Sequence, residues 1–347
     1  MGDEYGTINT HKRVPPETRD VMEVRQSRRL KMPRKIRRPY AERVGENSRC
    51  LCGALLAECS SHFVVTRCTS ICYCARCEQA FTYPPPYKTP KDCALYFDPA
   101  AVHSVPRRVD DFLGYARLTL YQLGDELALR GKRLLDFGCG GGELLVVAKA
   151  LGMDVFGVEI NPYQRNYLTE KGFRVAPSMA EFEGQTFDVV VLSHVLEHIP
   201  SPEPLLLKVA NLLGGGGRLL LSMPNLSSYL ARLLGRFWPG LQIDQHIWHF
   251  TPKTIAALLE RCGYDVEKVE ISALGKGRGA DGRSRYGGAV ALLDTHASLV
   301  GRMVLLGLLV IDGLFRGKVG QAIRRYGEKR GGDNMIVVAS RKVNAPT

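Results

Sequence analysis

The feature that most constrains this chain is a glycine-rich segment between an expected strand and an expected helix. The stretch LLDFGCGGGELL, residues 134–145, carries four glycines within five positions. Because glycine has no Cβ, such a turn lets a ligand lie against bare backbone. Downstream of it, strand patterns alternate with helical patterns, which predicts a parallel sheet with helices on both faces. We therefore expect an α/β protein with a Rossmann-like, doubly wound sheet from residue 131 onwards.

Two known glycine patterns compete for this turn. The dinucleotide fingerprint G-x-G-x-x-G requires glycine at position 143, which is Glu143. The pattern acidic-x-G-x-G-x-G fits in full, at Asp136, Gly138, Gly140 and Gly142. Glu159 ends the next expected strand, where a carboxylate can accept hydrogen bonds from both hydroxyls of a ribose.

The second pattern resembles the first motif of the class I S-adenosylmethionine-dependent methyltransferases. The resemblance covers about 131–271, through FDVVVLSHVLEHIPSPEPLLLKVANLLGGGGRLLLSMPN (187–225) and HIWHFTPKTIAALLERCGYDV (246–266), plus a last strand near 334–341. It implies a seven-stranded sheet and S-adenosylmethionine as cofactor. The cofactor-binding residues that it implies are Asp136, Gly138, Cys139, Gly140, Gly142, Glu159, Ile160 and Ser193.

Four histidines are candidates for the base that deprotonates an acceptor hydroxyl. His194 and His198 follow the expected fourth strand, and His246 and His249 lie between the fifth strand and its helix. We favour His246, because its loop lies where an acceptor would be placed and need not touch the cofactor. Each of these histidines could instead form hydrogen bonds within its own loop.

The segment after the fourth strand also leaves a metal site open. His194, Glu197 and His198 are spaced i, i+3, i+4 and share one face if a helix begins there. The segment resembles the ubiquinone-pathway O-methyltransferases, which carry Glu in place of His194 and in which this acid-rich cluster can hold a divalent metal. The alternative is that Glu197 and His198 order the loop over the cofactor. Phe237, Trp238 and Trp248 could form an aromatic wall of the acceptor pocket, or they could pack in the protein core.

Cysteines are concentrated near the start of the chain, with eight of the ten in residues 50–93. Without a secretory signal, such clustering indicates metal binding rather than disulfides. A C-x-C and a C-x-x-C pair could form a tetrahedral zinc site from Cys50, Cys52, Cys74 and Cys77. Cys68 or Cys72 could replace one of these ligands. The pattern resembles the zinc-binding heads of some sugar and natural-product methyltransferases.

Charge and composition divide the chain into four parts. The net charge of +12 lies in the flanks, with 13 Lys and Arg against 7 Asp and Glu in residues 1–49, and 8 against 2 in 316–347. We expect a basic arm at 1–49, a cysteine-rich zinc-binding module at 50–93 and a helical connector at 94–130. The methyltransferase domain follows at 131–347, with an apolar insert at 272–333. Residues 298–325, an apolar run and its basic neighbours, could contact a membrane surface or form a buried lid or dimer contact.

These observations predict methyl transfer from S-adenosylmethionine to a small-molecule hydroxyl, such as that of a glycan, a quinone or a secondary metabolite. The first alternative is an RNA methyltransferase that uses the zinc module and the basic flanks, which the neutral middle of the chain disfavours. The second is a non-catalytic binding protein that kept the fold. The chain opens without a signal-peptide pattern, so we expect it in the cytoplasm, with contact at the inner face of the membrane left open.

Overall fold

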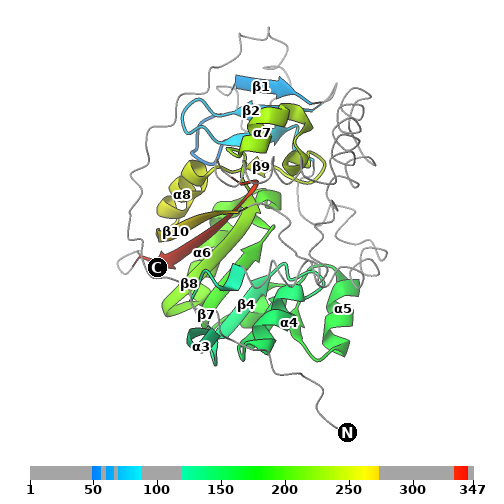
Figure 1. Cartoon of the computed structure of the whole chain (residues 1–347), viewed down its shortest axis with the longest axis vertical. Helices are drawn as coiled ribbons and strands as arrows, with labels where there is room; N and C mark the ends of the chain where they lie inside the picture. Colours follow the sequence, from blue (N-terminus) through cyan, green and yellow to red (C-terminus); the bar gives the residue numbers. More distant parts are fainter. Residues whose placement is uncertain are drawn as a thin grey trace, which may run out of the picture. The chain divides into compact units, whose positions relative to one another are not determined.

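A mixed sheet of seven strands forms the centre of the structure (Figure 1). The computed structural model describes residues 49–55, 60–65, 69–86, 119–124, 126–272 and 332–342, which all belong to the unit Arg38–Thr347. Across the sheet the strands follow in the order β10 (Tyr264–Ser272), β11 (Asn334–Arg341), β8 (Leu213–Pro224), β7 (Phe187–Ser193), β4 (Arg133–Phe137), β5 (Asp154–Val158) and β6 (Arg174–Ala176). Only β11 runs antiparallel to both of its neighbours. This arrangement confirms the doubly wound sheet and the last strand near 334–341.

The order of the strands reverses in the middle of the sheet. From β4 the chain proceeds to β5 and β6 on one side, and it then returns through β7 to β8 on the other. In open parallel sheets, ligands bind outside the carboxyl ends of the strands at such a reversal. The glycine turn follows β4 directly, so the fold places it at this point.

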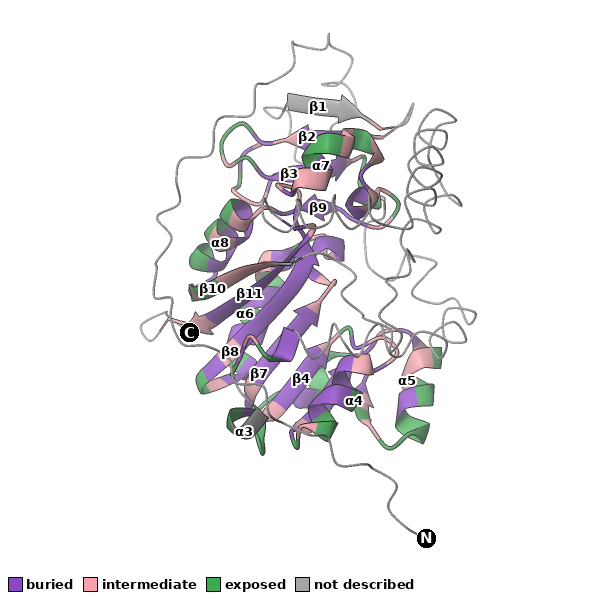
Figure 2. Cartoon of the chain, viewed as in Figure 1, coloured by how far each residue is buried: buried purple, intermediate pink, exposed green. Residues whose placement is uncertain are grey.

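Helices cover both faces of the sheet, as expected. Alternate residues of the strands belong to two different cores, because successive side chains of a strand point to opposite faces. One core contains Leu134 and packs against α4 and α5, whereas the other contains Leu135 and packs against α6 and α8. Figure 2 shows these strands as largely buried and the helices as buried on one side only. The helices are α3 (Glu126–Leu129), α4 (Glu143–Ala150), α5 (Pro162–Glu170), α6 (Pro202–Leu212), α7 (Tyr229–Leu234) and α8 (Pro252–Arg261), with 3-10 turns η5 (Met179–Phe182), η6 (Leu196–His198), η7 (Gly235–Phe237) and η8 (Pro239–Leu241).

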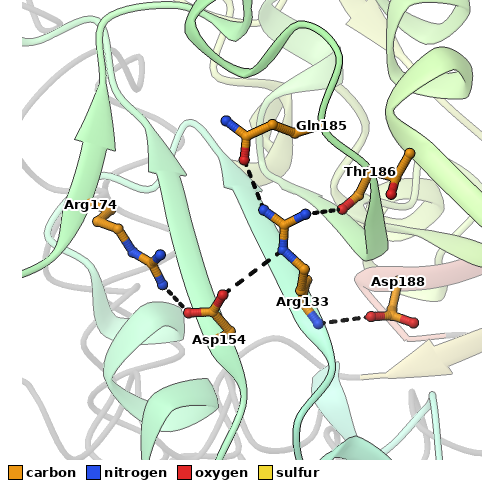
Figure 3. Close-up of polar contacts among 6 residues, drawn as sticks. All are labelled: Arg133, Asp154, Arg174, Gln185, Thr186 and Asp188. Atoms are coloured by element: carbon orange, nitrogen blue, oxygen red, sulfur yellow. Dashed lines mark hydrogen bonds and ion pairs between the residues drawn. The ribbon is translucent and has the colours of Figure 1, made fainter.

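A polar network ties together the amino ends of the parallel strands (Figure 3). The guanidinium of Arg133 donates to the carbonyl oxygen of Thr186 at 2.6 Å and to Oε1 of Gln185 at 2.8 Å. Asp154 pairs with Arg174 on the neighbouring strand. These partly exposed contacts lie at the edge opposite the glycine turn, so they support the sheet and not the site.

A second sheet joins the cysteine-rich segment to the rest of the chain. Its strands, in the order β1 (Ser60–Val64), β2 (Ser70–Tyr73), β3 (Ala80–Tyr83) and β9 (Trp248–His249), are all antiparallel. The fourth strand, β9, comes from the segment between β8 and α8. Cys74 and Phe81 also share a core with Trp248 and Phe250. The segment expected to form a separate module is therefore completed by two residues of the methyltransferase segment.

Several expected features lie outside the described residues. They are the basic arm up to residue 48, the connector up to residue 118, the insert at 273–331 with its apolar run, and Cys59, Cys68 and Cys93. Among the helices of the described ranges, none has the length and apolar character needed to cross a bilayer.

Candidate functional site

The glycine turn connects β4 to α4 in a left-handed backbone conformation. Gly138, Gly140 and Gly142 have φ angles of 77°, 52° and 83°. A Cβ at Gly138 would lie 2.6 Å from Cγ2 of Val195, and one at Gly142 would lie 2.4 Å from Cδ2 of Leu168. A Cβ at Gly140 would meet no described atom within 4 Å. Packing requires glycine at the first and third positions, whereas Gly140 leaves open the space from which a ligand can approach.

The buried carboxylate of Glu159 links this turn to the start of α5. Its Oε2 accepts a hydrogen bond from the backbone N–H of Gly140 at 2.8 Å, and its Oε1 accepts one from Asn161 at 2.7 Å. Burial raises the pKa of Glu159, and these two hydrogen bonds oppose that rise. Each carboxylate oxygen can accept a further hydrogen bond, so the pair can receive two neighbouring hydroxyl groups.

Asp136, near the end of β4, is the second acid of the turn and is also buried. Burial raises its pKa to about 8, and the nearby charges of Glu143 and Glu159 contribute to the rise. A carboxyl group in this state is stabilised as an anion when a cation comes next to it. The site therefore suits a ligand that carries both a ribose and an ammonium group.

The remaining expected cofactor residues lie around this turn. The side chain of Cys139 is buried, and its Sγ would lie 2.7 Å from a Cβ at Gly157, so the thiol packs against β5. Ile160 follows Glu159 directly, and Ser193 ends β7 opposite Ser222 of β8.

Asn161 is not among the site residues expected from the sequence. Its Oδ1 caps α5 by accepting from the backbone N–H of Tyr163 at 2.9 Å, while its own N–H holds Glu159. The pair Asn161-Pro162 is a typical helix start and was the signal that could have identified it.

The loop after β7 differs from the helix considered from the sequence. The chain forms only the single 3-10 turn η6, and His194 precedes it with a φ of 54°. The condition under which His194, Glu197 and His198 would share one helix face, a helix that begins at His194, is therefore not met. Nδ1 of His194 nevertheless lies 3.2 Å from Oε1 of Glu197. Burial raises the pKa of Glu197, but its hydrogen bond with His194 and the neighbouring rings of His198 and His246 lower it to about 2.

His198 and His246 form a buried pair next to this glutamate. Their ring centroids are 4.7 Å apart and the rings are nearly perpendicular. Nδ1 of His198 lies 3.1 Å from the carbonyl oxygen of Gln245, and Nδ1 of His246 lies 3.0 Å from that of Gly240. Burial lowers the pKa of both rings, that of His246 to about 4, so both are neutral at pH 7.

His249 lies in β9 and faces the cysteine-rich segment. Its Nε2 is 2.8 Å from Oγ1 of Thr82, and its carbonyl oxygen accepts a hydrogen bond from Nε2 of Gln79 at 3.0 Å. Burial lowers its pKa to about 3. Thr82 and Gln79 carry no local signal in the sequence, because the residue they contact is almost 170 positions away. His249 was considered either as a base or as a residue that forms hydrogen bonds with its surroundings, and these contacts match the second role.

The tryptophans belong to packed cores. Trp248 packs edge-on against Phe81 at 6.0 Å, and its Nε1 donates to the carbonyl oxygen of Ile199. Trp238 lies in a core with Ile71. Core packing, the alternative to an aromatic wall, accounts for both.

Four cysteine thiols converge in the cysteine-rich segment. Their Sγ atoms all lie within 4.8 Å of one another, with Cys50 3.5 Å from Cys77 and Cys52 3.6 Å from Cys74. Burial raises the pKa of Cys74, but hydrogen bonds from the backbone of Cys77 and Arg76 lower it to about 7. Cys72 is buried outside this group. The arrangement brings together the four residues expected from the sequence.

Comparisons with known proteins show which family the chain belongs to. A family described as a methyltransferase domain matches residues 107–269. A ubiquinone biosynthesis O-methyltransferase of Burkholderia ambifaria is 32% identical over 162 residues, which cover 42% of this chain and 69% of that protein. A second one, from Xanthomonas euvesicatoria, is 31% identical over 43% of this chain and 70% of its own. The chain belongs to the class I S-adenosylmethionine-dependent methyltransferases.

Among solved structures, an S-adenosylmethionine-dependent methyltransferase from Thermotoga maritima covers 70% of this chain and 98% of its own, with a TM-score of 0.43 and 15% identity. The matches to the methyltransferase domain and to the two O-methyltransferases show that the chain is a methyltransferase that uses S-adenosylmethionine, so the alternative of a non-catalytic protein is not supported. Which of its residues bind the cofactor remains a prediction.

We expect Gly140→Val to abolish binding of S-adenosylhomocysteine, because the new side chain would fill the open space above the turn. Gly172→Val is the matched control, since Gly172 also has a left-handed φ and open space around it but lies beyond α5. Glu159→Ala should weaken binding more than it lowers the maximal rate, because the ribose contact persists throughout the reaction. Calorimetry measures the affinities. Unchanged affinity in Gly140→Val would contradict the placement of the cofactor.

The buried His249 makes stability depend on pH. Its folded-state pKa of about 3 lies below the usual 6.5, so the unfolded chain binds the proton more readily. The contribution of His249 to the free energy of unfolding is therefore largest above pH 6.5 and falls as the pH decreases, by about 3 kcal/mol at pH 4. Urea unfolding at several pH values should give a shallower decline for His249→Gln than for the wild type. Parallel curves would show that His249 is not a buried neutral group.

Proposed function

We propose that the methyltransferase transfers the methyl group of S-adenosylmethionine to a hydroxyl group of a small molecule, with His194 as the general base. The observation that supports this is the contact between the glycine turn and the loop after β7. Val195 packs directly against Gly138, and His194 is the neighbour of Val195 in the chain. The loop that carries the base thus borders the turn that we assign to the cofactor.

His194 suits the role of base better than the other three histidines. About a third of its side chain is exposed, whereas His198, His246 and His249 are at most 8% exposed. A base must reach the proton that it removes. In the hydrogen bond with the ionised Glu197, Nδ1 of His194 is the donor, so Nε2 carries the lone pair that can accept a proton. The carboxylate also stabilises the imidazolium that forms, as in a catalytic triad.

The reaction then needs little besides orientation. The methyl carbon is already activated by the sulfonium, and an in-line displacement requires the acceptor oxygen behind it. As the oxygen–carbon bond forms and the sulfur–carbon bond breaks, the hydroxyl proton passes to Nε2 of His194. The products are the methyl ether and S-adenosylhomocysteine, and the proton leaves His194 to solvent.

The relatives and the charge of the chain support the proposed class of acceptor. The relatives named above are ubiquinone biosynthesis O-methyltransferases, so a small molecule with a hydroxyl group is the acceptor that they support. Residues 50–315 carry no net charge, which disfavours a large polyanion such as RNA at the site.

We further propose that Cys50, Cys52, Cys74 and Cys77 hold a structural zinc ion. Tetrahedral zinc–thiolate bonds of about 2.3 Å place the sulfurs nearly 4 Å apart, close to the separations found here. These sulfur–sulfur separations are too long for disulfides, in which the two sulfurs are about 2 Å apart. Four ligands leave no open position, which is typical of a structural role.

The first test of this proposal concerns the acceptor and the base. Labelled S-adenosylmethionine is incubated with the protein and with polar, lipid and RNA extracts, and we expect label in a small molecule. His194→Ala should lower the rate about 10²–10⁴-fold with binding of S-adenosylhomocysteine intact. Activity should partly recover at high pH, where the acceptor ionises unaided. A His194→Ala protein with the wild-type rate would exclude it as the base, and label in RNA alone would exclude the acceptor class.

The second test concerns the zinc ion. Elemental analysis of purified protein should find at least one zinc ion per chain, of which the cysteine site accounts for one. Cys74→Ser combined with Cys77→Ser should release it and lower the melting temperature. Cys72→Ser is the matched control, since Cys72 is equally buried and lies outside the cluster. A double variant with unchanged zinc content would refute the assignment of the ligands.

A further inference from the structure

Three metal-binding side chains converge in the interior next to His194. They are Glu197, His198 and His246, and the ligand atoms they offer all lie within 4.8 Å of one another. All three residues are buried. The group differs from the one considered from the sequence, because His246, from the loop before β9, takes the place of His194.

The hydrogen bonds of the two histidines fix which ring nitrogen can bind a metal. Nδ1 of His198 and Nδ1 of His246 each lie beside a backbone carbonyl, those of Gln245 and Gly240. A carbonyl oxygen can only accept, so each Nδ1 carries the proton and each Nε2 keeps a lone pair. Metal-bound histidines in proteins are held in this way, with the second ring nitrogen donating to a carbonyl or carboxylate.

Glu197 provides the second, independent observation. Its Oε1 pairs with His194, but its Oε2 is buried and has no hydrogen-bond partner. A buried carboxylate oxygen without a donor is costly, and such groups are rare in folded proteins. A cation bound to Oε2 would remove this cost.

The backbone holds the three groups in place. The N–H of Ile247 donates to the carbonyl oxygen of Glu197 at 2.9 Å, which joins the loop that carries His246 to η6. A site whose ligands come from two loops tied together in this way is formed before an ion arrives.

We propose that Glu197, His198 and His246 bind a divalent transition metal ion. Two imidazoles and one carboxylate suit zinc, iron(II), cobalt(II) or nickel(II), whereas magnesium and calcium prefer oxygen ligands alone. Three protein ligands leave coordination positions open. Ion binding itself needs no methyl transfer, so the inference goes beyond the proposed function.

Cobalt(II) substitution of the full chain tests the site, because it separates the two kinds of ligand. Cobalt at the cysteines gives thiolate charge-transfer bands, whereas cobalt at a histidine–carboxylate site gives ligand-field bands alone. We expect the wild type to bind about one cobalt ion of the second kind. His246→Gln and Glu197→Gln should each lose these bands and weaken binding at least about tenfold. His249→Gln, a change at a buried histidine outside the group, should retain them.

Retention of the bands in both ligand variants, or loss in His249→Gln alone, would overturn the assignment. If the ligand variants are unfolded by circular dichroism, the X-ray absorption spectrum of the cobalt-loaded wild type decides. A population of cobalt with nitrogen and oxygen neighbours supports the site, and sulfur neighbours alone overturn it. S-adenosylhomocysteine binding and methyl transfer are measured on the same preparations, so a failure of the proposed function is seen separately.

Discussion

The meeting of the parallel strands at one edge of the sheet is the constraint on which the site depends. Strands β4, β5, β7 and β8 all end there, and each is followed by a segment that carries residues of the candidate site. The hydrogen bond between Gly140 and Glu159 joins the first two of these segments, and the contact between Gly138 and Val195 joins the first and the third. The close approach that glycine permits therefore serves both the open face for a ligand and the packing of the loop that carries His194.

The two-residue strand β9 couples the cysteine-rich segment to this edge. On one side β9 pairs with β3, accepts a hydrogen bond from Nε2 of Gln79 and shares one with Oγ1 of Thr82. On the other, Ile247 just before it bonds to Glu197, and Nε1 of Trp248 bonds to Ile199. Because the backbone N–H of Cys74 donates to Gln79, whose side chain donates to His249, hydrogen bonds run from the cysteine cluster to this histidine. A change in the cluster thus has a physical route to the acceptor side.

Local sequence patterns were sufficient to predict the strands and helices of the seven-stranded sheet. The glycine turn, the strand of 334–341 and the helices after β7 and β8 lie where periodicity and resemblance placed them. The four clustered cysteines were also identifiable, because two short spacings mark two knuckles. The conformation of the segment that carries His194, Glu197 and His198 could not be predicted, because i, i+3, i+4 spacing fits both an α-helix and a single 3-10 turn. The partners of His249 could not be found, because pairing between β3 and β9 is a contact of long sequence separation.

The sequence by itself determined the order of elements and the chemistry available at each strand end, because periodicity and glycine placement are local properties. Only the tertiary structure decided how the four histidines differ. They come from two loops, and their exposure, tautomers and partners depend on which carbonyls and carboxylates the fold brings beside each ring. Thus His194 remains accessible beside Glu197, while His198 and His246 turn inwards to the same carboxylate and His249 is held by Thr82. Burial and hydrogen bonding assign those roles, and neither is encoded in the spacing of the residues.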